Sequence, residues 1–149
     1  MQEPIIAWRA WRVGIEVCDY KLQSLYDDSI WPFGQPMKED QTKYANVPTD
    51  FCLPGIHAFK TMQNLADYLC EGIKYDHLRN VLVVLGEVYL WGKIKEHKLG
   101  YRAEYAYPKK IRAYKPYNPE KNKPDFHYTK FIANNYGCEI FIPEGVTNE

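Results

Sequence analysis

The sequence predicts an α+β fold in which a curved, mainly antiparallel sheet carries two helices. Apolar and polar residues alternate over several segments, which is the side-chain period of a strand, whereas two other segments follow the 3.6-residue period of a helix. The 13 tyrosines agree with a sheet-rich chain, because aromatic residues pack well on strands. We expect one domain over residues 1–149, with a partly closed barrel as the alternative to an open sheet.

The first 54 residues combine two strands with a long loop. Ile5 to Val17 alternates and predicts a strand, and Tyr20 to Tyr26 alternates weakly as its candidate hairpin partner. From Asp27 to Pro54, prolines and glycines interrupt every apolar period, so we expect an irregular Pro-rich loop over about residues 27–54. Trp31 and Phe33 predict that part of this loop packs against the core.

Two segments predict helices. Thr61 caps a helix that should run to about Ile73, because its apolar residues recur with the helical period. A second helix is expected over Phe126 to Tyr136, with Gly137 as its C-cap. A short strand should precede the first helix at residues 55–60, and another should follow the second at residues 138–142.

The most informative segment is a hairpin over Leu85 to Pro108. Val81 to Leu85 is apolar throughout, as in a strand buried on both faces, and the strand continues to His97. After a turn at residues 98–100 the chain returns to Pro108, which should end the ladder because proline has no amide donor. We expect a basic-aromatic surface arm over about residues 109–124. Its positive charges and aromatic rings suit the binding of a nucleotide or of single-stranded nucleic acid. A solvated loop with scattered charge is the simpler interpretation of this segment.

Composition excludes several classes of protein. Lys plus Arg equals Asp plus Glu at 19 each, which argues against non-specific nucleic-acid binding, because such binding depends on an excess of positive charge. Specific nucleic-acid recognition is not expected either. No apolar run is long enough to span a bilayer, so no membrane association is expected. The four cysteines are widely spaced and no signal peptide is visible, which predicts free thiols in a cytoplasmic protein. No cofactor or metal site is expected, since His57, His97 and carboxylates would have to converge from distant positions.

Polar residues concentrate around the turn of this hairpin, and they form the candidate site. Glu96 falls on an apolar strand face, so we expect it to pair with Arg102 and, with Glu104, to form a partly buried ion network. The alternative to a binding role is that this network only fixes the register of the two strands. His97 should face the other way, with Trp91 and Tyr89. The predicted ligand-binding residues are His57, Lys60, Trp91, Glu96, Tyr101, Arg102, Glu104 and Tyr105.

Three segments together resemble a family of small bacterial and phage proteins of unassigned activity. They are AWRAW near the start, PGIHAFKT at residues 54–61 and GEVYLWGKIKEHKLGYRAEYAYP at residues 86–108. The resemblance covers about half the chain and implies a cytoplasmic bacterial or phage origin, without a mechanism. Family members carry a second cysteine just before the Gly-x-His element. Here Cys52 is followed by Leu53 and Pro54, which argues against a required metal or disulfide at that place.

The sequence favours a non-enzymatic binding protein over an enzyme. Its ligand would be a small polar molecule, with a nucleotide as one candidate, or a host partner protein. The alternative is a nucleotide-dependent transferase, similar to ADP-ribosyltransferases, that uses His57, a tyrosine and a glutamate of the hairpin. A third hypothesis is a structural protein that forms a homo-oligomer through its Trp and Tyr stripes.

Overall fold

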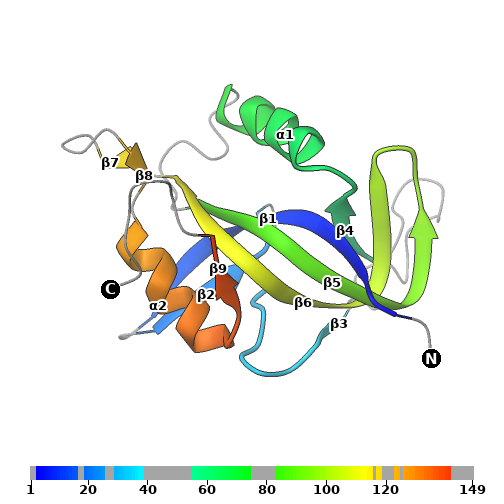
Figure 1. Cartoon of the computed structure of the whole chain (residues 1–149), viewed down its shortest axis with the longest axis horizontal. Helices are drawn as coiled ribbons and strands as arrows, with labels where there is room; N and C mark the ends of the chain where they lie inside the picture. Colours follow the sequence, from blue (N-terminus) through cyan, green and yellow to red (C-terminus); the bar gives the residue numbers. More distant parts are fainter. Residues whose placement is uncertain are drawn as a thin grey trace.

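The computed structural model describes residues 3–16, 19–25, 29–38, 55–74, 83–115, 117–118, 123–124 and 126–141. It confirms the predicted α+β fold: in this part of the chain two helices pack against a curved, mainly antiparallel sheet of seven strands (Figure 1). A separate pair of two-residue strands, β7 (Tyr117–Asn118) and β8 (Lys123–Pro124), lies beside it.

Four strands of the sheet pair in a ring. The strand β1 (Ile5–Glu16) pairs with β5 (Val83–Glu96), and β5 pairs with β6 (Gly100–Lys115). The short strand β4 (Ile56–Phe59) lies between β6 and β1 and closes the circuit. The strand β2 (Asp19–Gln23) adds to the outer edge of β1 as the predicted hairpin partner.

The closure between β1 and β4 is short and depends on a side chain. Trp8 and Phe59 are the paired residues of the two strands. The guanidinium of Arg9 adds a hydrogen bond from Nη1 to the carbonyl oxygen of His57 at 2.5 Å, and its plane lies over the ring of Trp31. Arg9 therefore ties the backbone of β4 to β1 where the ladder itself contributes little.

The strand β6 is longer than the sequence predicts. Pro108 does not end the ladder: β6 continues to Lys115 and stays paired with β5, and the register shifts between Glu87 and Val88. Lys109 forms a bulge in β6 directly after Pro108, and the ladder thereby passes a residue that cannot donate. The expected surface arm is thus wrong for residues 109–115, which are strand.

The helix α1 (Met62–Lys74) covers the outer side of the ring. The backbone amide of Asn64 donates a hydrogen bond to Thr61 Oγ1 at 3.1 Å, which confirms the predicted N-cap. Leu65 and Leu69 are buried and pack against residues of β1 and β5 that face outward. Figure 1 shows α1 on one side of the sheet and α2 on the other.

The helix α2 (Phe126–Tyr136) packs on the inner core, which confirms the second predicted helix. It ends at Gly137, where φ is +65° and the Cys138 amide donates to the Ala133 carbonyl at 3.0 Å, as in a helix C-cap. The strand β9 (Glu139–Ile140) then pairs in parallel with β6.

The hydroxyl of Tyr136 joins three parts of the fold. It accepts a hydrogen bond from the Leu22 amide at 2.7 Å and donates to the Trp31 carbonyl at 2.6 Å. Burial raises the pKa of Tyr136 to about 12, because the charged phenolate is disfavoured away from water. Tyr136 therefore connects α2 to β2 and to the segment that contains Trp31.

Part of the predicted Pro-rich loop is ordered against the core. Trp31 is buried, as expected, and β3 (Met37–Lys38) pairs with β6. Residues 39–54 of that loop lie outside the described residues. Neither helix of the described chain is long and apolar enough to cross a membrane.

Candidate functional site

A bulge at Gly92 decides which side chains share a face of the hairpin. Trp91 pairs with Tyr105 and Ile94 pairs with Ala103, so β5 has one residue more than β6 between these pairs. Gly92 takes φ +82°, a conformation that glycine adopts without strain. The extra residue inverts the alternation of β5 beyond this point.

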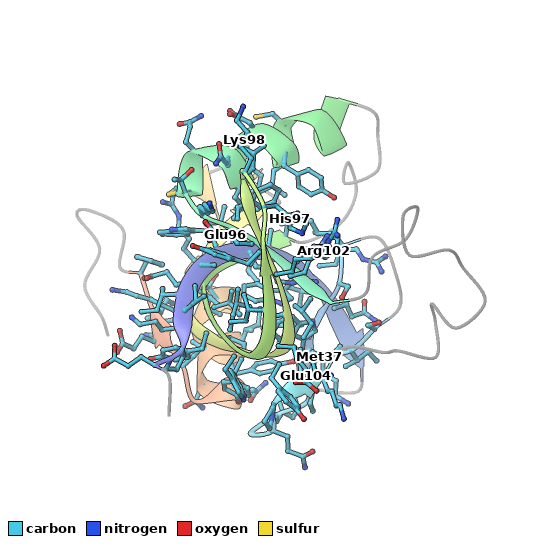
Figure 2. The ribbon with its side chains drawn as sticks, turned by 90° about the vertical axis from the view of Figure 1, so that its right-hand side faces the viewer. Met37, Glu96, His97, Lys98, Arg102 and Glu104 are labelled. Carbon is cyan, nitrogen blue, oxygen red and sulfur yellow. The ribbon has the colours of Figure 1, made fainter. Side chains whose placement is uncertain are left out.

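The inversion corrects the predicted faces. Because paired residues share a face, Trp91 lies on the same face as Tyr105, Ile94 and Glu96. His97 lies on the opposite face, so the prediction that it accompanies Trp91 is wrong. Figure 2 shows Glu96 on one side of the hairpin, and His97 and Arg102 on the other.

We name the two sides by their principal residues. The Glu96 face contains Lys60, Glu96 and Tyr101. The Arg102 face contains Arg102, its two cross-strand neighbours His57 and Lys95, and His97, the residue after β5.

On the Glu96 face, the carboxylate pairs with Lys60 and not with Arg102. Lys60 Nζ lies 2.6 Å from Glu96 Oε2, and the ammonium also lies 5.6 Å from the centroid of the Tyr101 ring. The hydrogen bond and charge of Lys60 lower the pKa of Glu96. The predicted network of Glu96, Arg102 and Glu104 is therefore wrong, because β4 supplies a closer cation from a distant part of the chain.

Glu104 has a local structural partner. Its Oε1 accepts a hydrogen bond from the Lys93 amide at 3.2 Å, inside the bulge. Beside it, the rings of Trp91 and Tyr105 are stacked at 5.8 Å with an interplanar angle of 18°, and Lys38 lies over Tyr105 at 5.7 Å. These groups stabilise the base of the hairpin, where Figure 2 places Glu104 near Met37 and away from Arg102.

On the Arg102 face, two strands place an arginine against a histidine. His57 is directly opposite Arg102, and Arg102 Nε donates to His57 Nε2 at 3.0 Å. That nitrogen must be unprotonated to accept, so the imidazole is neutral in this arrangement. The Nη1 atom of Arg102 is screened from solvent and has no hydrogen-bond partner among the described residues.

His97 is the second unusual group of this face. Its backbone closes the turn by donating to the Gly100 carbonyl at 2.7 Å, which orients the side chain toward Arg102. Its Nε2 is also screened from solvent and unpaired within the described part of the chain. Desolvation lowers the pKa of His97, and the positive charges of Arg102 and Lys95 lower it further.

The Arg102 face is thus rich in hydrogen-bond donors and positive charge. Lys95 and Arg102 are cross-strand partners, which places two cations side by side. Of the three described carboxylates of the hairpin, Glu96 is paired with Lys60, Glu104 accepts from the Lys93 amide, and Glu87 lies opposite Lys110 toward the other end of the ladder. Such a surface suits an anion.

The predicted site divides into three groups, one on each face of the hairpin and one at its base. Of the eight predicted residues, His57 and Arg102 meet on one face, Lys60, Glu96 and Tyr101 meet on the other, and Trp91, Glu104 and Tyr105 form the base of the hairpin. His97 was missed as a ligand contact because simple alternation places it beside Trp91. Glycine inside a strand is a known sign of a bulge, and Gly92 was the signal that could have corrected this.

The geometry bears on two other hypotheses. A transferase would need a histidine, a tyrosine and a glutamate together, but Tyr101 and Glu96 lie on the face opposite His57, and the other candidates, Tyr105 and Glu104, lie at the base of the hairpin. Across the described residues no group of three or more His, Cys, Asp or Glu side chains could hold a metal ion.

Comparisons of the chain with protein families, curated proteins and solved structures return no match. The resemblance inferred from the hairpin motif therefore stays a prediction. Function has to be argued from the site itself.

Proposed function

We propose that this chain is a binding protein that holds the anionic group of a small polar ligand on the Arg102 face. One observation carries the proposal: Arg102 Nη1 and His97 Nε2, from residues on the same side of the hairpin (Figure 2), are both screened from solvent and have no protein partner in the described residues. A buried polar group without a partner loses its hydration and gains nothing in return, which costs about 1–3 kcal/mol for a typical group. An anion that accepts from both would remove that cost.

The location of these atoms supports a ligand over a packing defect. The indole nitrogens of Trp11 and Trp31 are also unpaired, but both rings are buried in the apolar core. His97 and Arg102, in contrast, are only half-buried side chains on the hairpin, so exposing these two atoms to a solute needs a side-chain rotation and no opening of the core. A host protein, the other partner class that the sequence suggests, stays a prediction.

Nuclear magnetic resonance of the imidazole groups tests this proposal. Methyl phosphate, sulfate and acetate are titrated separately into the protein, and the ring carbon–hydrogen signals of His57 and His97 are followed. We expect a saturable shift of both signals with at least one anion, and its loss in Arg102→Gln. The variant Lys98→Gln removes one positive charge from the turn of the same hairpin and should keep the response.

Three results would overturn the proposal. The first is the absence of any saturable shift in the wild-type protein. The second is a response that survives Arg102→Gln. The third is a loss of the same size in Lys98→Gln, since this would show a non-specific effect of charge. Circular dichroism of each variant establishes that the fold is intact.

A further inference from the structure

We infer that the anion bound on the Arg102 face is a dianionic phosphomonoester, and that its binding places a proton on His97. This inference rests on the proposed function and specifies the ligand class and the proton linkage of the same site. The terminal phosphate of a nucleotide and that of a phosphorylated metabolite share this chemistry.

The charges of the face match a dianion. Arg102 and Lys95 are cross-strand partners and together supply two positive charges. Of the two carboxylates nearest the turn, Glu96 is paired with Lys60 on the other face, and Glu104, two residues along β6 from Arg102, accepts a hydrogen bond from the Lys93 amide at the bulge. Two fixed cations compensate a phosphomonoester, whereas a phosphodiester or a carboxylate carries only one negative charge.

The arrangement of donors points the same way. Arg102 of β6 and His97, the residue after β5, lie on one side of the hairpin (Figure 2), and each has an unpaired nitrogen there, Nη1 and Nε2. Arginine presents its donors in a planar fork that matches phosphate oxygens. A monoester offers three terminal oxygens, so it can accept from both residues and still keep one oxygen for Lys95.

Binding should change the protonation of His97. In the free protein two causes keep the pKa of His97 below 6.5: burial of the ring and the cations Arg102 and Lys95. A bound dianion opposes the second cause directly and also accepts a hydrogen bond from Nε2–H, which favours the imidazolium form. The pKa therefore rises on binding, and a proton is taken up at any pH between the free and the bound value.

All charged groups around His97 enter this argument. The Glu96 face is on the far side of the hairpin, and its lysine and glutamate neutralise each other. The imidazole of His57 accepts from Arg102 and carries no charge in this geometry. By element, the titratable groups are His57 of β4 and Lys60 directly after it, Lys93, Lys95 and Glu96 of β5, Lys98 of the turn, and Arg102 and Glu104 of β6.

Isothermal titration calorimetry with methyl phosphate and dimethyl phosphate tests the inference. The second compound differs by one methyl ester and cannot become a dianion. At pH 7.0 and low salt we expect methyl phosphate to bind at least about tenfold more tightly, because one more charge interacts with the cations. Titrations in two buffers with different heats of ionisation then give the protons exchanged, and we expect uptake of at least about 0.3 proton.

The variant His97→Gln isolates the proton. Glutamine keeps a side-chain donor but does not titrate, so binding should persist while the proton uptake by the protein is lost. A phosphomonoester has its own second pKa of about 6, so His97→Gln should show only the small proton release that comes from the monoanionic fraction of the ligand. From pH 8 to 7, where the ligand is mostly dianionic, wild-type affinity should rise as the pH falls, and this rise should be absent in His97→Gln. Lys98→Gln removes the charge of the neighbouring residue and should keep the uptake.

The two levels of the proposal fail differently. If neither compound binds and no anion shifts the histidine signals, the proposed function is wrong. If methyl phosphate binds but dimethyl phosphate binds equally well, the site takes any phosphate and the assignment to monoesters is wrong. If proton uptake is absent, or survives in His97→Gln, the proton linkage is wrong while the anion site stands.

Discussion

Replacing Gly92 with alanine tests the bulge that separates the two faces of the hairpin. Gly92 adopts φ +82°, and the left-handed region costs an alanine roughly 1–2 kcal/mol. A Cβ atom at this position would lie 2.7 Å from Glu104 Oε1 and 2.8 Å from Tyr105 Cδ2. The carboxylate can move aside, but the Tyr105 ring is stacked on Trp91 and has less freedom.

The two costs add. Overpacking against a constrained ring costs about 1–3 kcal/mol, so Gly92→Ala should lower the free energy of unfolding by about 2–5 kcal/mol in total. With a urea m-value of about 2 kcal/mol/M, the midpoint of unfolding should fall by about 1–2.5 M. Equilibrium unfolding followed by tryptophan fluorescence measures this change.

Gly34 provides a matched control. It has φ +65°, and an added Cβ would meet nothing within 4 Å. Gly34→Ala should therefore show only the backbone cost of about 1–2 kcal/mol. If Gly92→Ala were no more destabilising than Gly34→Ala, the added Cβ would not clash with Glu104 and Tyr105, and the reasoning would be refuted.

Three further predictions concern other parts of the fold. Tyr136→Phe should lower the free energy of unfolding by about 2–4 kcal/mol in urea titrations, because two buried backbone groups lose their partner. The pKa of Tyr136 is about 12 in the folded protein against 10.0 ordinarily, so the stabilisation that the protonated hydroxyl provides is fully present below pH 10 and is lost as the pH rises through 12. The free energy of unfolding of the wild type should therefore fall more steeply over this range than that of Tyr136→Phe. Lys60→Met should raise the pKa of Glu96 toward 4.5, measured by carbon-13 chemical shifts, and an unchanged value would contradict the assigned ion pair. Burial raises the pKa of Cys138 to about 11, so iodoacetamide at pH 8 followed by peptide mass spectrometry should label the exposed Cys70 first; equal labelling of both in the folded protein would count against this.

Local signals in the sequence were sufficient for the two helices. Thr61 predicts the start of α1, and its hydroxyl does accept from the Asn64 amide. Gly137 predicts the end of α2, and it does adopt a left-handed conformation there. Caps and helical periods depend on neighbours within four residues, so a sequence displays them directly.

The strands were predicted well in type and less well in extent. Alternation identifies a strand from its own residues, as in β1 and β5. It does not show how far pairing continues, and β6 passes Pro108 with a bulge at Lys109, where the register against β5 shifts. The length of a strand is a property of the pair.

The sequence by itself therefore determined the α+β class, the helix boundaries and the concentration of polar residues on the hairpin. Only the tertiary structure decided how those residues divide into two faces. Glu96 is paired by Lys60 from 36 residues away, and Arg102 bonds to His57 from 45 residues away. These contacts require β4 to insert beside β6, and they require the bulge at Gly92 to turn His97 toward Arg102. Both are consequences of long-range pairing, to which local periodicity is blind.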